Sequence, residues 1–167
     1  MVVFAMFFLV FVYYRGYDTP LYARSQSTLN QGFGVLNTLL LLTSSWFVAL
    51  AVQAARQNRG TQSFKLLALA FLCGLGFVIV KIFEYAEKIR AGITLETNDF
   101  YMYYYLFTGI HLVHVLIGMG VLVYLQNEAR AAHCDAKTIG VMESGASFWH
   151  LVDILWVILF ALLYLMK

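Results

Sequence analysis

Two histidines stand at the centre of a long apolar stretch of this 167-residue sequence. His111 and His114 are three residues apart, so on a helix they project on one side, together with Tyr104 and Gly118. An ionisable side chain at the centre of a bilayer costs about 2.5–3.5 kcal/mol, so it is expected to face protein and to have a partner. The spacing favours neutral histidines that hydrogen-bond between helices. The alternatives are a proton relay, a lipid-headgroup contact, and a haem or metal ligand.

An aspartate, Asp153, lies inside the last apolar stretch. It belongs to one helical face with three aromatic residues: Trp149, Asp153, Trp156 and Phe160. Asp153 lies about 12 Å from the start of its predicted helix, and His114 on the preceding antiparallel helix lies within about 5 Å of the same depth. We therefore expect either a contact between His114 and Asp153 across two helices, or a hydrogen bond from Asp153 to His150 on its own helix.

Charged residues gather where the third apolar stretch ends. Lys81 and Glu84 are spaced as an i,i+3 pair, and Glu84 and Lys88 as an i,i+4 pair in the favoured orientation. The simplest interpretation is local pairing, with long side chains that reach toward the membrane interface. A role in a subunit interface or in proton entry is the alternative.

The composition decides the surroundings in which these residues must be positioned. Hydrophobic residues make up 62% of the chain and charged residues 12%, whereas a soluble domain carries roughly 25% charged residues. The mean hydropathy is +0.76. These values exclude an ordinary soluble domain and a disordered chain, and a net charge of +2 is too small to suggest a nucleic-acid partner.

The apolar stretches predict an all-α, integral membrane bundle in one domain over residues 1–167. Backbone in hydrocarbon must satisfy its own hydrogen bonds, and about 20 apolar residues span a core roughly 30 Å thick. Four stretches reach that length: Gly32–Ala55, Phe64–Tyr85, Phe100–Leu125 and Ala146–Met166. Residues 1–14 reach only about 20 Å. We interpret them as the first of five transmembrane helices, truncated in this chain; a short interfacial or re-entrant helix is the alternative.

Sequence motifs for common enzyme sites are missing. The sequence has no Cys-x-x-Cys-His, no phosphate-binding glycine loop and no nucleophile elbow. A small haem b-binding redox subunit would have to use His111 or His114 with His150. A proton-translocating protein would have to use Lys81, Glu84 and Asp153. Both stay alternatives, which an absorption spectrum and a vesicle assay would separate.

Four sequence motifs resemble subunit III of haem-copper cytochrome c oxidases. They lie in Asn37–Ser45, Gly76–Tyr85, Thr108–Gly118 and Glu143–Trp156. The third reads Thr-Gly-Ile-His-Leu-Val-His-Val-Leu-Ile-Gly, and the fourth is similar to the family's Glu…Trp-His-Phe-Val-Asp-x-x-Trp ending. In the second motif Lys81 stands where the family has glutamine. The resemblance covers nearly the whole chain, mapped onto the last five helices of the longer seven-helix form.

The resemblance implies a non-catalytic subunit of a cytochrome c oxidase-type complex, without a catalytic centre, metal or haem of its own. Haem and copper are expected in the partner, the catalytic subunit I, beside which this chain would pack with other subunits. Bound phospholipid, support of assembly and stability, and help in proton uptake are implied as well. We expect a multi-pass protein of a bacterial or archaeal plasma membrane.

The residues that we expect to carry this role make structural, lipid or subunit contacts. They are His111, His114, His150, Asp153, Glu84, Lys81, Trp149 and Trp156. The branch of the family is less defined. The run from Leu42 to Arg56 is similar to the five-helix NorE-type proteins associated with nitric oxide reductase, but short five-helix oxidase subunits exist too. The partner could therefore reduce oxygen or nitric oxide.

Overall fold

The computed structural model describes residues 2–17, 31–93, 99–130 and 136–165. Every regular element within these residues is a helix, which confirms the all-α prediction. The elements are α1 (Val2–Tyr17), α3 (Gln31–Arg56), α4 (Gly60–Arg90), α5 (Asp99–Ala129), α6 (Ala136–Phe160) and the π-helix η1 (Ala161–Leu165).

Four helices of the described residues are long and apolar enough to cross a membrane: α3, α4, α5, and α6 together with η1. They have 26 to 31 residues, or about 39–46 Å, which exceeds a hydrocarbon core of roughly 30 Å. Their end turns therefore extend beyond the hydrocarbon into the headgroup layer. Helix α1 has 16 residues and falls short of that length, so a fifth membrane crossing stays a prediction.

The helices extend past the apolar stretches from which they were predicted. Helix α4 runs to Arg90 rather than Tyr85, and α6 begins at Ala136 rather than Ala146. The added turns mix polar and apolar residues, and they include lysine, glutamate, arginine and alanine, which are good helix formers. The predicted ends at Met1 and Met166 lie outside the described residues.

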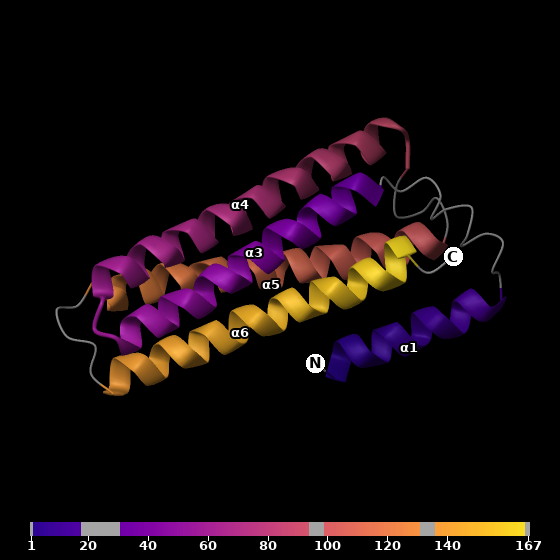
Figure 1. Ribbon diagram of the computed structural model, residues 1–167. Helices are drawn as coiled ribbons and strands as arrows, with labels where there is room; N and C mark the ends of the chain where they lie inside the picture. Colours follow the sequence, from indigo (N-terminus) through magenta and orange to yellow (C-terminus); the bar gives the residue numbers. More distant parts are fainter. Residues whose placement is uncertain (1, 18–30, 94–98, 131–135, 166–167) are drawn as a thin grey trace.

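Helices α3, α4, α5 and α6 form a closed, antiparallel bundle (Figure 1). Each packs against two of the others: α3 and α5 both contact α4 and α6. Two ends can be defined. At the Arg56 end, α3 and α5 finish and α4 and α6 begin; at the Arg90 end, α4 and η1 finish and α3 and α5 begin. The bundle axis thus fixes the relative depth of every side chain discussed below.

Only three residues connect α3 to α4, and their backbone closes α3. Asn58 has a positive φ of 55°, a conformation that asparagine tolerates better than most residues. Its N–H donates to the Ala55 carbonyl at 2.9 Å, and the Arg59 N–H donates to the Ala54 carbonyl at 3.0 Å. This is the Schellman pattern of a helix C-terminus, and it sets α4 directly against α3.

Small residues allow the helices to approach at the centre of the bundle, as is typical of membrane interfaces. Ser44 of α3 donates a hydrogen bond to the Ala70 carbonyl of α4 at 2.8 Å. On α5, a Cβ added to Gly118 would lie 2.8 Å from the Trp149 ring. Glycine is therefore required at this position, because any side chain would collide with the tryptophan of α6.

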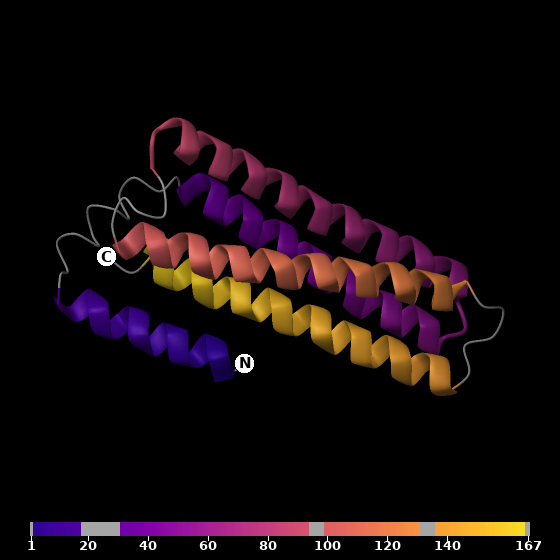
Figure 2. The same cartoon turned by 180° about the vertical axis from the view of Figure 1, so that it is seen from behind.

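Helix α1 lies outside this bundle, along α5 (Figures 1 and 2). Its contacts are ring contacts: Phe8 with Phe107 at a centroid distance of 5.8 Å, and Tyr14 with Tyr103 at 6.2 Å. Most of its other described side chains are exposed. Helix α1 therefore adds an aromatic flank to α5 without contributing to the closed core.

Candidate functional site

A buried polar cluster lies toward the Arg90 end, where α4, α5 and η1 meet. Lys81 Nζ and Glu84 Oε2 are 2.7 Å apart, and the two side chains are only 1% and 2% exposed. Glu84 Oε1 accepts hydrogen bonds from the hydroxyls of Tyr104, at 2.8 Å, and Tyr164, at 2.5 Å. Lys81 Nζ also donates to the Tyr164 hydroxyl at 3.1 Å. We call these four residues the Lys81–Glu84 cluster.

Aromatic rings complete the surroundings of the ammonium group. Lys81 Nζ lies 4.6 Å from the ring centroid of Trp156, a distance at which the ring quadrupole attracts a cation. Burying two charges is unfavourable unless their remaining hydrogen-bonding groups are satisfied. The two tyrosine hydroxyls and the tryptophan ring supply that compensation, so the cluster joins three helices through one carboxylate and one ammonium.

The prediction of a Lys81–Glu84 pair is confirmed, but its expected setting is wrong. Both side chains face the bundle core and do not reach the interface, because α4 turns this side toward α5 and η1. The expected Glu84–Lys88 pair is not among the ion pairs of the described residues. Instead, Lys88 Nζ lies 5.6 Å from the centroid of the Tyr104 ring.

The π-helix η1 brings Tyr164 to this cluster. The repeat of aromatic residues that places Trp156 and Phe160 on one face continues at the same spacing of four to Tyr164, which is fully buried. The wider π-turn alters the backbone hydrogen bonds of the last turn, and the Gln31 side chain donates to the Tyr164 carbonyl at 3.2 Å. The start of α3 thereby fastens the end of α6 beside the cluster.

His111 is fully buried in an aromatic layer next to this cluster. Its ring centroid lies 5.7 Å from that of Phe77 on α4 and 5.4 Å from that of Trp156 on α6. Neither ring nitrogen has a hydrogen-bond partner among the described residues. The predicted hydrogen bond between helices is therefore wrong for His111, because the rings of Phe77 and Trp156 occupy the facing positions of α4 and α6.

His114 points away from the core, toward α1. Its ring packs edge-on against Phe4 at 5.6 Å, and its Nδ1 lies 2.8 Å from the Ile110 carbonyl of the preceding turn. The predicted contact with Asp153 is wrong. Three residues along a helix differ by about 60° in direction, so His111 faces α6 while His114 is turned to the outside of α5.

Asp153 and His150 of α6 converge on a hydroxyl of α3. His150 Nδ1 forms a hydrogen bond with Ser45 Oγ of α3, and the Asp153 carboxylate faces the same hydroxyl. Asp153 is 5% exposed, and its Oδ1 has no partner among the described residues. The predicted direct bond between Asp153 and His150 is thus replaced by a shared neighbour, Ser45.

The two tryptophans of α6 that were predicted as contact residues both face the core. Trp149 packs on Gly118 of α5 and Gly74 of α4. Trp156 lies 4.9 Å from Phe77 in an edge-on arrangement, and its indole N–H donates to Thr38 Oγ1 of α3 at 3.1 Å. Each tryptophan therefore connects α6 with two other helices.

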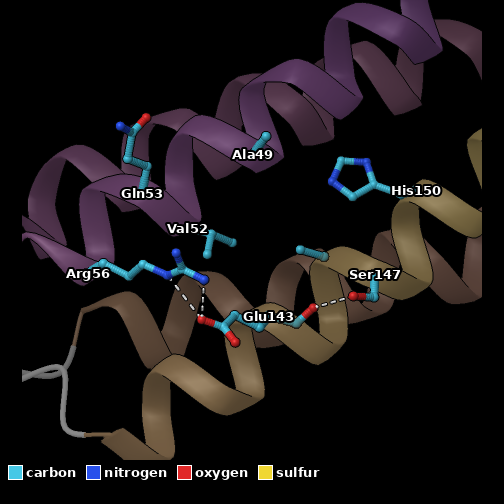
Figure 3. Close-up of a pocket in the computed structure, with 8 residues that line it drawn as sticks. Ala49, Val52, Gln53, Arg56, Glu143, Ser147 and His150 are labelled. Atoms are coloured by element: carbon cyan, nitrogen blue, oxygen red, sulfur yellow. Dashed lines mark hydrogen bonds and ion pairs between the residues drawn. The ribbon is translucent and has the colours of Figure 1, made fainter.

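A groove between α3 and α6 opens toward the Arg56 end (Figure 3). Arg56 reaches from α3 to Glu143 on α6, and its Nε and Nη2 donate to Glu143 Oε1 at 3.0 and 2.7 Å. The His150 ring lies farther along the groove. The space measures about 520 Å³ and is lined by Ala49, Val52, Gln53, Arg56, Glu143, Ala146, Ser147 and His150. We call it the α3–α6 groove.

Sequence reasoning missed three contacts of these two regions. Tyr164 could have been found, since it continues the spacing of the aromatic face of α6. Ser45 was assigned only to helix approach, although it lies at the depth of His150. Arg56 and Glu143 fell in connectors predicted to be loops, and two residues in separate loops give no periodicity from which a pair could be predicted.

Comparison with known proteins finds that the sequence is similar to oxidase subunits. The sequence profile of the family described as Cytochrome c oxidase subunit III matches residues 26–167. Cytochrome c oxidase subunit 3 of Aedes aegypti is 32% identical over 130 residues, which are 78% of this chain and 48% of that protein. The Thermostichus vulcanus protein of the same name is 31% identical over 134 residues, 78% and 64% of the two chains.

A third relative is the heme-copper oxidase subunit I+III of Aeropyrum pernix. It is 27% identical over 139 residues, which are 79% of this chain and 16% of that protein. The chain spans about half to two thirds of the length of the two subunit 3 relatives above. The matched part includes the four spanning helices and with them both the Lys81–Glu84 cluster and the α3–α6 groove.

Proposed function

The chain belongs to the cytochrome c oxidase subunit III family, and from this premise we propose that it is a non-catalytic, subunit III-like component of a haem-copper respiratory complex. In this proposal it packs beside the catalytic subunit I in a bacterial or archaeal plasma membrane. It supports assembly and stability of the complex, binds phospholipid and helps to sustain proton uptake by the catalytic subunit.

One observation carries the proposal: five residues of the family motifs are buried between the helices of the bundle. Glu84, His111, Trp149, Asp153 and Trp156 are each at most 5% exposed. Among the described residues, their contacts include rings, hydroxyls and glycines of neighbouring helices. A motif that serves to join helices is what a structural subunit needs.

The proposal assigns haem and copper to the partner subunit and none to this chain. Among the described residues, no three His, Cys, Asp or Glu side chains converge as metal ligands would. His111, His114 and His150 lie in three different surroundings, so no pair of them faces a common space. The Aeropyrum pernix relative, named as a subunit I+III, supports the idea that this chain lies next to a subunit I.

The outer face of the bundle supports contact with lipid or with helices of a partner. Large apolar side chains are more than half exposed there, among them Leu39, Trp46, Leu72, Ile82 and Phe83. Whether the complex is an oxidase or a nitric oxide reductase follows from the branch. The resemblance of Leu42–Arg56 to NorE-type proteins favours the second, and the oxidase names of the relatives favour the first.

Copurification tests the proposal. The chain, carrying an affinity tag in its own host, is isolated in mild detergent and the accompanying proteins are identified. We expect a large haem-bearing subunit at equal stoichiometry, and its oxygen or nitric oxide reduction then identifies the branch. Recovery of the chain without any haem protein, under conditions that preserve other respiratory complexes, would contradict the proposal.

The same preparation separates the two rival functions. The chain alone should show no Soret band, whereas stoichiometric haem bound through histidine would favour a haem b-binding subunit. In sealed vesicles the chain alone should not dissipate a pH gradient faster than protein-free vesicles. A faster decay that is lost in Glu84→Gln would favour proton translocation instead.

A further inference from the structure

The ion pair at the mouth of the α3–α6 groove leaves hydrogen-bonding capacity unused. Arg56 directs two of its N–H groups to a single atom, Glu143 Oε1. A guanidinium has five N–H donors, and a carboxylate has a second oxygen that accepts. The two side chains are 61% and 43% exposed. One cation and one anion, each with free positions, therefore stand side by side at an accessible edge.

The depth of this pair is that of lipid headgroups. Arg56 occupies the last turn of α3, and Glu143 lies near the start of α6. Because these helices exceed the thickness of a hydrocarbon core, their terminal turns lie in the polar layer of a bilayer. The same end carries the basic residues Arg59, Lys65 and Arg130, so a phosphate is attracted to it.

The lining of the groove combines small or apolar side chains with polar ones. The side chains of Ala49 and Ala146 are too small to fill the space between α3 and α6, and Val52 adds an apolar wall. Ser147 donates to the Glu143 carbonyl at 2.9 Å, and His150 binds Ser45. Gln53 also lines the groove, and its side chain is exposed (Figure 3).

We propose that the α3–α6 groove binds one phospholipid with a zwitterionic, primary-amine headgroup, of the phosphatidylethanolamine class. The phosphate accepts hydrogen bonds from Arg56, and the ammonium donates to Glu143. This assignment specifies the lipid binding of the proposed function, on which it rests. A phosphatidylglycerol headgroup has no cation for Glu143 and places its phosphate near that carboxylate. A phosphatidylcholine headgroup has no N–H to donate.

Native mass spectrometry of the full chain in mild detergent tests the site. The chain is presented with equimolar dioleoyl phosphatidylethanolamine, phosphatidylcholine and phosphatidylglycerol, and the bound lipids are counted. We expect phosphatidylethanolamine to exceed each of the others by about tenfold, the ratio that corresponds to one charge-assisted hydrogen bond. Glu143→Gln should bring the ethanolamine-to-glycerol ratio near one, and Arg56→Gln should reduce the binding of all three lipids.

Control variants separate the groove from general charge effects. Lys65→Gln and Glu87→Gln change the same charges at exposed positions outside the groove, and both should keep the wild-type preference. Ala49→Leu fills the groove while retaining both charges and should abolish lipid retention. Circular dichroism confirms that each variant stays helical. Equal binding of the three lipids by the wild type, or unchanged binding in Ala49→Leu, overturns the inference.

The outcomes for the groove and for the function are separable. A chain that copurifies with a haem-bearing subunit yet shows no headgroup preference refutes the lipid site and leaves the proposed function standing. A chain that selects phosphatidylethanolamine but copurifies with no haem protein refutes the proposed function and leaves the lipid site standing.

Discussion

Two ion pairs at opposite ends of the bundle share a distance and differ in everything around it. In the Lys81–Glu84 cluster and in the Arg56–Glu143 pair, the nearest nitrogen and oxygen atoms are 2.7 Å apart. The first pair is 1% and 2% exposed and is surrounded by tyrosine hydroxyls and rings. The second pair is 61% and 43% exposed.

The difference teaches that the surroundings, and not the separation, decide what an ion pair contributes. An exposed pair contributes about 0–1 kcal/mol, because water and salt screen it and two long side chains lose freedom. A buried pair gains less net stability than its Coulomb energy suggests, but breaking it leaves one charge without a partner in the core. We therefore expect the Lys81–Glu84 cluster to be destabilised by any single substitution, and the α3–α6 groove to tolerate many substitutions.

Removing the ammonium of the cluster should have the largest effect. Lys81→Met leaves the Glu84 carboxylate buried without its cation, and we expect the free energy of unfolding in detergent to fall by about 3–5 kcal/mol. Lys65→Met, at an exposed position of the same helix, should change it by less than about 0.5 kcal/mol. Equal effects of the two substitutions would contradict the importance of burial. The double change Lys81→Met with Glu84→Leu should recover much of the loss.

Removing one hydroxyl of the cluster should have the next largest effect. Tyr164→Phe retains the ring but removes one hydrogen bond to the Glu84 carboxylate, which is expected to cost about 1.5–3 kcal/mol. The measurement is again the free energy of unfolding, with Tyr124→Phe, a half-exposed tyrosine of α5, as the control. A loss no greater than that of the control would mean that Tyr104 alone satisfies the carboxylate.

The hydroxyl between the two regions should show an intermediate effect. Ser45→Ala removes the partner of His150 and a polar neighbour of Asp153, and a loss of about 0.5–1.5 kcal/mol is expected for a partly buried hydrogen bond. Thr43→Ala provides the matched control, because its hydroxyl is exposed and bonds only to its own helix, at the Leu39 carbonyl. If both variants unfold alike, the bond between Ser45 and His150 contributes nothing to stability.

The exposed pair should show the smallest effect and the only salt dependence. Arg56→Gln should lower the free energy of unfolding by less than about 1 kcal/mol. Raising the salt concentration to 1 M should shrink this difference further, because the Debye length falls to about 3 Å. The loss in Lys81→Met should stay unchanged over the same range. A salt-sensitive Lys81→Met would show that water reaches the cluster.

The sequence was sufficient for the membrane helices because hydrophobicity acts along the chain. Each of the four long apolar stretches lies in a helix long and apolar enough to span a membrane. The i,i+3 spacing of Lys81 and Glu84 was enough to predict their pairing. Helix ends were less accessible to prediction. The turn from Glu87 to Arg90 is largely polar, and residues 136–145 mix polar residues and glycines with apolar ones. Such segments fit a helix in the headgroup layer as well as a loop.

The sequence predicted which residues of one helix share a face, but not which residues of other helices that face contacts. Trp149, Asp153 and Trp156 were correctly predicted to share one face of α6, and the structure turns that face to the core. The partners of His111 and His114 were not, because the prediction fixed their depth but left the rotation of α5 about its axis undetermined. A rotation of about 60° separates an imidazole among core rings from one beside α1, and the packing of Trp149 on Gly118 settles that angle.

The three-residue connection between α3 and α4 has a mechanical consequence. A turn closed by its own backbone hydrogen bonds at Ala54 and Ala55 leaves little slack between the two helices. We therefore expect α3 and α4 to tilt together when the bilayer becomes thinner or thicker, since tilt is the ordinary response of a long helix to such a mismatch. Lys81 and Glu84 lie in the far half of α4, so we expect a change of tilt to alter how closely Tyr104 and Tyr164 pack around them.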